Sequence, residues 1–389
     1  MADDAPPEQP RFTVGDDHIR LLDTGPRRLE ALIALIDGAR RSLRILFYIY
    51  SDDAAGGRVR DALTRARGRG VSVTLIIDGF GSAVARDDHY FDTLEAAGGH
   101  VCRFVPRFGR RYLLRNHQKL ALADEARLIT GGFNIEDSYF GTVAQQAWQD
   151  LGVEIEGPAA ARIAAYFDGL ADWARQDKAK VRDLRRLLRR ASETRGAVRW
   201  LIGGPTAGLS PWARTLRSDM RDAAMVEMIA AYFAPGPLLL RRMERAGRRG
   251  RFRLITAARS DNQATIAAAR FTYRGLLRRG AEIYEFQPTK LHTKLYAIDD
   301  VVHVGSANFD MRSLFINLEL MVRIDDPAFA AHVRGYFEGE IARCEAITRE
   351  VEKARTNPWV RVKQFAAYLL IAVLDPNVSR RLNFGLDGK

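Results

Sequence analysis

One short pattern occurs twice in this chain, and it constrains the fold more than any other feature. The pattern His-x-Lys-x-x-x-x-Asp is found at residues 117–124 and again at residues 292–299. In each copy a turn of small residues ending in asparagine follows, at residues 131–134 and 305–308. The two histidines are 175 residues apart (292 minus 117), which is the length of a whole domain. The repeat therefore predicts two similar halves and excludes a solenoid of short units.

Each motif is preceded by a similar succession of predicted elements. In the first half we expect strands at 42–50, 71–78, 101–105 and 119–123, and helices at 57–69 and 90–97. In the second half we expect strands at 223–232, 251–256, 283–286 and 294–298, and helices at 238–248 and 265–279. Strands that alternate with helices indicate βαβ units with helices on both faces of a sheet. We therefore predict an α/β fold of two α/β/α sandwich halves, related by a pseudo-two-fold axis, with the active site between them.

The expected domain boundaries follow from the motifs and from local composition. The first half should span residues 15–175 and the second half residues 201–350, joined by a basic linker at 176–200. The acidic, proline-containing residues 1–14 are expected to be disordered, and residues 351–389 form a basic and apolar tail.

Two segments have the composition of a surface that meets lipid. In the linker, the apolar residues of 181–190 fall on one helical face between arginines, which suits either an interfacial helix on anionic lipid or a helix that covers the core. In the tail, the apolar run 365–374 has basic residues on both sides. This run of ten residues is shorter than the roughly 20 of a membrane span, so either membrane docking or packing on the body remains open.

Charge and cysteine content limit the partners and the compartment. The formal net charge is +12 and the pI is about 9.9. Such a chain attracts nucleic acid or an anionic membrane face, and charge alone does not choose between them. The two cysteines form no disulfide framework and fit a reducing compartment. With no signal peptide visible at the N-terminus, we expect a cytoplasmic protein.

The motif residues are suited to phosphodiester chemistry. Side chains two residues apart on a strand share a face, so His117 and Lys119 should face one cleft together with His292 and Lys294. Displacing an alcohol from a phosphodiester needs a nucleophile, positive charge near the non-bridging oxygens and an acid for the leaving group. Two histidines and two lysines supply all three. Because the sequence has no cluster with metal-ligand spacing, we expect neither a metal nor a cofactor.

The duplicated motif resembles the signature of the phospholipase D superfamily, and its surroundings resemble those of bacterial cardiolipin synthases. The segments that carry the closer resemblance are 48–50 (YIY), 78–82 (DGFGS), 148–150 (WQD), 232–235 (YFAP) and 305–313 (GSANFDMRS). The resemblance implies a phosphohistidine intermediate and a ping-pong course. It implies His117 as the nucleophile and His292 as the acid and base, although the two roles could be exchanged.

The resemblance also assigns roles around the histidines. We expect Lys119, Lys294, Asn134 and Asn308 to hold the phosphate oxygens, with Ser306 as a further donor.

Relatives place a carboxylate 25 to 33 residues after each motif histidine to orient it, and Asp150 and Glu319 stand at the matching places. Each is expected to bind the histidine of its own motif. We count Asp124 and Asp299 with the catalytic motifs, and interpret them as structural carboxylates that brace the turn after the motif strand.

These residues favour phosphatidyl transfer on anionic glycerophospholipids. The most specific hypothesis is cardiolipin synthesis with phosphatidylglycerol as donor and acceptor, and phospholipase D hydrolysis would use the same chemistry. The partners would be anionic phospholipid and the cytoplasmic face of the inner membrane, with peripheral attachment. The alternative is a phospholipase D-type nuclease, since a basic cleft suits a nucleic-acid backbone. The fused duplicate and the flanking segments favour lipid, and two intact motifs argue against a non-catalytic binding module. The acceptor and the oligomeric state stay open.

Overall fold

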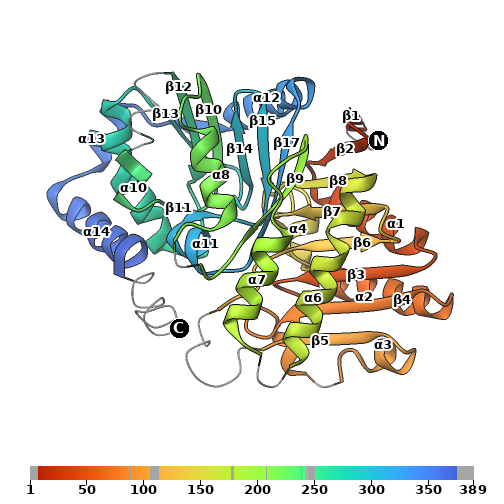
Figure 1. The fold of residues 1–389 in the computed structure, drawn as a ribbon. Coiled ribbons are helices and arrows are strands. Elements are labelled where there is room, and N and C mark those ends of the chain that lie inside the picture. The colour runs from red at the N-terminus through yellow and green to blue at the C-terminus, as the bar shows by residue number, and fades with distance from the viewer. Residues whose placement is uncertain are drawn as a thin grey trace, which may run out of the picture.

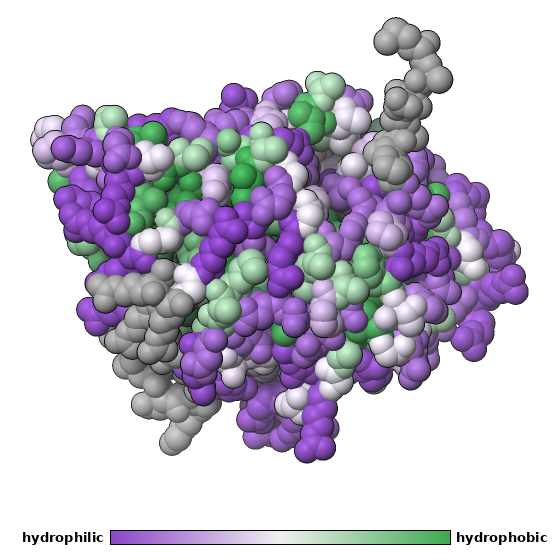
Figure 2. Space-filling model, turned by 90° about the horizontal axis from the view of Figure 1, so that it is seen from above, coloured by the Kyte–Doolittle hydropathy of each residue, from purple (hydrophilic) through white to green (hydrophobic). Residues whose placement is uncertain are grey.

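Two sheets of eight strands lie side by side in the computed structural model of the protein, one in each half of the chain (Figure 1). The structure describes residues 8–374 except 88, 106–113, 177–178, 207, 238, 242 and 244–249. Most of the helix expected at 238–248 therefore lies outside the described residues. Figure 2, from above, shows a mostly hydrophilic face with small apolar patches.

The first half contains one mixed sheet, in the order β1-β2-β8-β7-β6-β3-β4-β5. Its strands are β1 Phe12–Val14, β2 Asp17–Leu22, β3 Ser42–Phe47, β4 Ser72–Asp78, β5 His100–Phe104, β6 Leu120–Ala123, β7 Arg127–Gly131 and β8 Gly152–Glu156. Its helices are α1 Gly25–Gly38, α2 Ala54–Gly68, η1 Ala83–Arg86, α3 Asp92–Ala96, α4 Asp137–Phe140, α5 Pro158–Arg162 and α6 Ala164–Arg175.

The second half contains the other mixed sheet, in the order β18-β13-β12-β10-β14-β15-β17-β9. Its strands are β9 Val198–Gly203, β10 Met225–Ala230, β12 Arg251–Ala257, β13 Glu282–Phe286, β14 Lys294–Ile298, β15 Val301–Gly305, β17 Glu319–Asp325 and β18 Cys344–Ala346. The short strands β11 Phe233–Ala234 and β16 Phe309–Asp310 pair with each other. The helices are α8 Pro211–Asp219, α10 Gln263–Arg278, α11 Met311–Phe315, α12 Pro327–Ile341, α13 Arg349–Arg355, α14 Pro358–Tyr368 and η2 Leu369–Leu374. Helix α7 Val181–Ala191 connects the halves.

The two sheets repeat one strand order, which confirms the predicted α/β duplication. Read from its outer edge, β5-β4-β3-β6-β7-β8-β2 in the first half matches β13-β12-β10-β14-β15-β17-β9 in the second. Only the first three strands of each series are parallel, and the motif strands β6 and β14 run antiparallel to β3 and β10. The sheets are therefore mixed, because β-hairpins and not helices connect the motif strands to the strands that follow.

Local sequence explains the elements that position the motifs. Strand β4 is an almost continuous apolar run with a buried C-terminal half, as expected for a strand covered on both faces. Helix α10 buries Ile266, Ala269, Tyr273 and Leu276, which are spaced three or four residues apart. Asn262 caps this helix by accepting a hydrogen bond from the backbone N–H of Ala264.

One hydrophobic core runs through both halves. It includes Val153 of β8 and Phe167 of α6 from the first half, with Val322 of β17 and Phe337 of α12 from the second. Because the same apolar cluster contains residues of both sheets, neither half buries its inner face without the other.

Two expected boundaries change, and the described part of the tail is structured. Residues 12–14, expected to be disordered, form strand β1, which pairs with β2; residues 1–7 lie outside the described residues. Strand β9 already begins at Val198, inside the predicted linker. The described part of the tail forms helices, and α14 packs beside α10 (Figure 1). No helix among the described residues is both long and apolar enough to cross a bilayer.

Candidate active site

The two motif histidines lie at corresponding places and line one cavity. His117 stands just before β6 and His292 just before β14. A cavity of about 750 Å³ is lined by both, and by Asn134 and Asn308 from the turns that follow the motif strands. The geometry thus brings the two copies of the motif to a single site.

Backbone pairing between the halves fixes these positions. The N–H of His117 donates to the carbonyl of Leu318 at 2.9 Å, and the N–H of His292 donates to the carbonyl of Gln149 at 2.7 Å. Leu318 comes directly before Glu319, and Gln149 comes directly before Asp150. Each motif histidine is therefore bonded to the residue that precedes a carboxylate of the opposite half. Both walls of the cleft are therefore joined by backbone hydrogen bonds that run from one half to the other.

The orienting carboxylates are exchanged between the halves. Nδ1 of His117 lies 3.0 Å from Oε2 of Glu319, and Nδ1 of His292 lies 2.7 Å from Oδ2 of Asp150. The expectation that each carboxylate binds the histidine of its own motif was therefore wrong. The pairing crosses because the backbone bridges bring each histidine next to the opposite half's carboxylate strand.

Charge settles the hydrogen-bond direction. Burial raises the pKa of Glu319 and Asp150, but the neighbouring histidines and lysines outweigh it and hold both pKa values below their ordinary range. Ionised carboxylates only accept hydrogen bonds, so Nδ1 of each histidine donates. In a neutral imidazole this leaves Nε2 with the lone pair.

Burial favours the neutral form of both imidazoles. Burial lowers the pKa of His292 to about 3, with a further lowering from Lys294 that Asp150 opposes. The pKa of His117 is also lowered, first by burial, while Glu319 raises it. A neutral imidazole is the nucleophilic form, so either histidine could act as the nucleophile.

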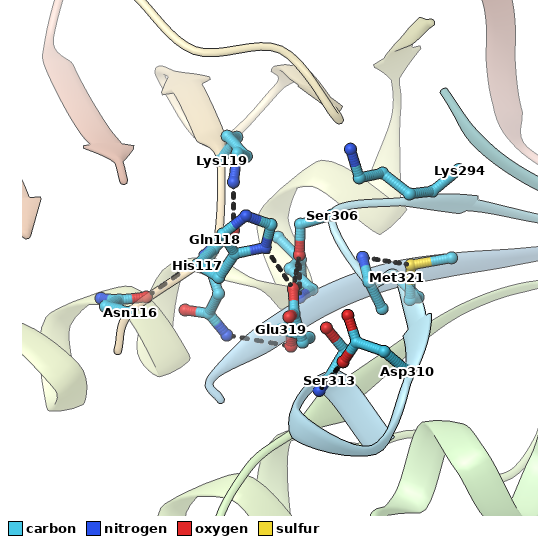
Figure 3. Close-up of polar contacts among 12 residues, drawn as sticks. Asn116, His117, Gln118, Lys119, Lys294, Ser306, Asp310, Ser313, Glu319 and Met321 are labelled. Carbon is cyan, nitrogen blue, oxygen red and sulfur yellow. Dashed lines mark hydrogen bonds and ion pairs between the residues drawn. The ribbon is translucent and has the colours of Figure 1, made fainter. Parts of the chain in front are cut away.

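The motif lysines are buried, each against the backbone of the histidine of its own motif. Lys119 and Lys294 are 0% and 1% exposed. Nζ of Lys119 donates to the carbonyl of His117 at 2.6 Å, and Nζ of Lys294 donates to the carbonyl of His292. Burial lowers the pKa of Lys119 to about 7 and that of Lys294 to about 8. Figure 3 shows Nζ of Lys119 directed at the backbone of His117.

The two asparagines differ in their partners. Oδ1 of Asn134 accepts a hydrogen bond from the N–H of Ile49 at 3.2 Å, which fixes that amide on the cavity wall. Oδ1 of Asn308 is buried and has no hydrogen-bond partner among the described residues. Both amides line the cavity, where their NH₂ groups could donate to an anionic oxygen.

Ser306 does not face the substrate cavity. Its hydroxyl donates to Oε2 of Glu319 at 2.6 Å and accepts from the N–H of Leu320 at 3.0 Å (Figure 3). It is fully buried. The expectation that Ser306 binds the phosphate was therefore wrong, because both of its hydrogen-bonding directions serve the carboxylate and its strand. Gly132 occupies the corresponding place in the first half, where an added Cβ would lie 2.3 Å from Oδ1 of Asp150.

The motif aspartates also lie away from the chemistry. Asp124 follows β6 and accepts hydrogen bonds from the N–H groups of Arg40, Arg41 and Ser42 at 2.7–2.9 Å. Asp299 follows β14 and binds the N–H groups that lead into β10. Because each strand separates its aspartate from its histidine, they are not catalytic. They brace the turns, where both have positive φ, 55° and 47°.

Several cavity residues were not predicted as site residues from the sequence. Arg115 lies over the Phe80 ring at 3.7 Å, and Tyr48 lies edge-on to the His117 ring at 4.9 Å. Asp310 lines the same cavity, and burial raises its pKa to about 6. Tyr48 lies in one of the flanking segments quoted above. Nothing in the sequence indicated Arg115 as a site residue except its position two residues before the motif.

The segment 78–82 forms a turn that supports the first motif. Asp78 is buried and accepts hydrogen bonds from the N–H groups of Phe80 and Gly81, both at 2.9 Å, and of Asn116 at 2.8 Å. It therefore ties this turn to the residue just before His117. Among the described residues, no group of three or more His, Cys, Asp and Glu side chains is placed to hold a metal ion.

Comparisons with known proteins agree with this architecture. The family model described as cardiolipin synthase, PLD-like domain, matches residues 32–171 and 220–341. Cardiolipin synthase A of Pseudomonas aeruginosa strain LESB58 is 29% identical over 347 residues, covering 87% of this chain and 70% of the relative. The cardiolipin synthase of Listeria welshimeri is 27% identical, covering 92% and 76%.

Solved structures share the fold. The crystal structure of phosphatidylserine synthase from Haemophilus influenzae Rd KW20 matches with a TM-score of 0.71 at 13% identity, over 94% of this chain and 97% of that one. Polyphosphate kinase from Porphyromonas gingivalis matches with a TM-score of 0.55 at 14% identity, over 90% and 53%. With the family model matching both halves, this chain belongs to the phospholipase D superfamily, as an enzyme of the family described as cardiolipin synthase, PLD-like domain.

Proposed function

We propose that the protein transfers a phosphatidyl group between anionic glycerophospholipids through a phosphohistidine intermediate, and that it makes cardiolipin from two molecules of phosphatidylglycerol. The observation that carries the proposal is the pair of motif histidines on one cavity. Each has its Nδ1 held by a buried carboxylate of the opposite half. Membership of a cardiolipin synthase family supports the choice of lipid.

In the first step, neutral His117 is the nucleophile. Its Nε2 attacks phosphorus, a P–N bond forms, and the bond from phosphorus to the headgroup glycerol oxygen breaks. His292, protonated at Nε2, gives its proton to that oxygen, and free glycerol leaves. Glu319 stabilises the charge that develops on His117, as the aspartate does for the histidine of a hydrolytic triad.

In the second step, the intermediate is passed to another lipid. Neutral His292 takes the proton of a glycerol hydroxyl on a second phosphatidylglycerol, the hydroxyl oxygen attacks phosphorus, and the P–N bond breaks. Cardiolipin leaves with both phosphates, and His117 and His292 return to their starting forms. Water in place of that hydroxyl would give phosphatidic acid.

The acid role of His292 requires a proton that burial of the imidazole disfavours. A bound phosphodiester is an anion, and an opposite charge nearby raises the pKa of an imidazolium. Asp150 adds to this effect from the other side of the ring. Substrate binding would therefore charge His292 when the proton is needed.

The phosphate oxygens need positive charge and hydrogen-bond donors. We assign Lys119 and Lys294 as the charges, and the amides of Asn134 and Asn308 as the donors. Asn308 lines the cavity, so its NH₂ group is within reach of a substrate bound there. Because donor and acceptor are both membrane lipids, we also propose that the enzyme works as a peripheral protein at the cytoplasmic face of the inner membrane.

The test is a product analysis by mass spectrometry. The purified protein is incubated with phosphatidylglycerol vesicles, and cardiolipin and glycerol should appear in equal amounts, with none from the His117→Ala variant. Phosphatidic acid without cardiolipin would reassign the protein as a phospholipase D. If no lipid is consumed while a plasmid or single-stranded DNA is cleaved, the nuclease alternative replaces the proposal.

A further inference from the structure

Exposed apolar side chains concentrate on the helices at the end of the described chain. Seven large apolar residues of the described chain are exposed, and four of them lie between residues 359 and 370. They are Trp359 at 76%, Val362 at 55%, Phe365 at 49% and Leu370 at 55% exposure. Residues 359, 362, 366 and 370 recur at helical spacing, so they share one face of α14 and η2. We call Trp359, Val362 and Leu370 the α14 face; Phe365 stands beside it, with its ring 5.4 Å from that of Phe271.

The inward side of α14 is firmly packed. Tyr368 is buried, its ring lies 4.9 Å from that of Phe271 on α10, and its hydroxyl donates to the carbonyl of Pro235 at 2.8 Å. The guanidinium of Arg361 lies 4.3 Å from the Phe271 ring centre. Asn357 caps the helix by accepting a hydrogen bond from the N–H of Val360 at 2.9 Å. The α14 face is therefore presented outward by a helix that is anchored on the body.

This face adjoins the active-site cavity. Ile371, next in sequence to Leu370, lines the cavity that contains both motif histidines. Phe80, 52% exposed, lines it from the first half. Apolar side chains from both halves thus line the cavity that the acyl chains of a lipid substrate would have to approach.

Basic residues accompany the α14 face. Lys363 is exposed on α14, and Arg274 and Arg278 are exposed on α10, the helix that α14 packs against. Apolar side chains with basic neighbours match an anionic bilayer, into whose interface an amphipathic helix lays its apolar side.

We propose that the α14 face is the surface by which the enzyme lies on an anionic phospholipid bilayer, with the cavity mouth turned toward the lipid. This proposal rests on the proposed function, because only a lipid substrate makes that orientation useful. The linker helix α7 has the opposite character. Its Leu184 and Leu188 are buried in the core, so it presents arginines without an apolar face.

Trp359 offers a direct probe. The other four tryptophans are buried or half-buried, so Trp359 should dominate quenching by brominated lipids in vesicles of phosphatidylcholine and phosphatidylglycerol. We expect quenching that grows with phosphatidylglycerol content, and its loss in Trp359→Phe. Equal quenching in the parent and in Trp359→Phe, under conditions where both bind vesicles, would overturn the proposal.

A second measurement separates docking from chemistry. The triple variant Trp359→Ser/Val362→Ser/Leu370→Ser should bind these vesicles about tenfold more weakly or worse, and turn over vesicle phosphatidylglycerol correspondingly slowly. It should still turn over a short-chain phosphatidylglycerol kept below its critical micelle concentration. Val143→Ser is the matched control, since Val143 is 41% exposed in the loop after α4, and it should behave like the parent.

The outcomes distinguish the two proposals. If the parent turns over the short-chain lipid and the triple variant binds vesicles as well as the parent, docking by the α14 face is refuted. The same holds if light scattering shows that the triple substitution only dissociates a dimer, with vesicle binding unchanged. If the parent binds vesicles through the α14 face but turns over neither lipid form, the proposed function fails instead.

Discussion

The two halves of this protein share a backbone plan but differ in how they hold their catalytic groups. Strand order, motif position and bracing aspartate are repeated from one half to the other. The surroundings of the two carboxylates differ. Glu319 accepts a hydrogen bond from the Ser306 hydroxyl. Asp150 has Gly132 at the corresponding place and accepts a hydrogen bond from the N–H of Leu151 at 2.7 Å. The two halves therefore share the backbone arrangement around their histidines, but the hydrogen bonds to the carboxylate of each histidine differ.

The crossing of the carboxylates makes the halves interdependent. His117 and Lys119 come from one half and their carboxylate Glu319 from the other, and the reverse holds for His292 and Asp150. A single half would expose a buried carboxylate face and lose the orientation of its histidine. The site therefore requires both halves in one arrangement, which the shared core maintains.

The largest expected effect concerns the two histidines. His117→Ala and His292→Ala should each reduce turnover of phosphatidylglycerol by at least about 10³-fold, because each removes a group that acts on the reacting atoms. An activated diester, whose leaving group needs no acid, separates their roles. With this substrate, His292→Ala should still form a phosphoenzyme at His117, detectable by mass spectrometry, and His117→Ala should not.

Circular dichroism of both variants checks that the fold is kept. A phosphoenzyme on His292 in the His117→Ala variant would exchange the two roles. Substantial turnover by either variant would refute a mechanism with two essential histidines.

The next largest effect tests the crossing itself. Glu319→Gln and Asp150→Asn should each lower kcat by about 10²- to 10⁴-fold, because an amide oxygen cannot stabilise the imidazolium as a carboxylate does. Nitrogen NMR of ¹⁵N-labelled histidine gives the sharper readout. Glu319→Gln should shift the Nδ1 signal of His117, and Asp150→Asn that of His292. Shifts in the reverse pairing would contradict the crossed geometry.

A smaller effect follows from the unequal lysines. Both pKa values are lowered by burial, to about 7 for Lys119 and about 8 for Lys294, so in the free enzyme each ammonium is charged below its pKa and loses its charge as the pH rises through it. KM for phosphatidylglycerol should therefore rise above pH 7, by no more than about tenfold per pH unit for each group. In Lys119→Met the lower of the two inflections should vanish. A KM that stays constant from pH 6 to 9 would remove the lysines from phosphate binding.

Sequence reasoning succeeded where the information was local. Alternation and motif spacing predicted the strand that begins at Lys294 and the strand that begins one residue after Lys119. The convergence of His117 and His292 follows from two copies of one fold. The crossing could not be predicted, because Glu319 and His117 are 202 residues apart. Only the backbone bridge at Leu318 brings them together. Ser306 was misassigned for a similar reason, since a hydroxyl beside a predicted site can face either the ligand or a supporting carboxylate.

The smallest expected effect isolates that hydroxyl. Ser306→Gly gives the second half the residue that the first half has at Gly132, and removes one hydrogen bond to Oε2 of Glu319. A hydrogen bond to a charged group contributes about 1.5–3 kcal/mol, but His117 still donates to the same oxygen, so we expect kcat to fall by only about 3- to 30-fold. KM should not change, because the Ser306 hydroxyl donates to Glu319 and accepts from the N–H of Leu320, which leaves it no hydrogen for the substrate. A rise in KM with constant kcat would instead place this hydroxyl on the phosphate, as the sequence had indicated.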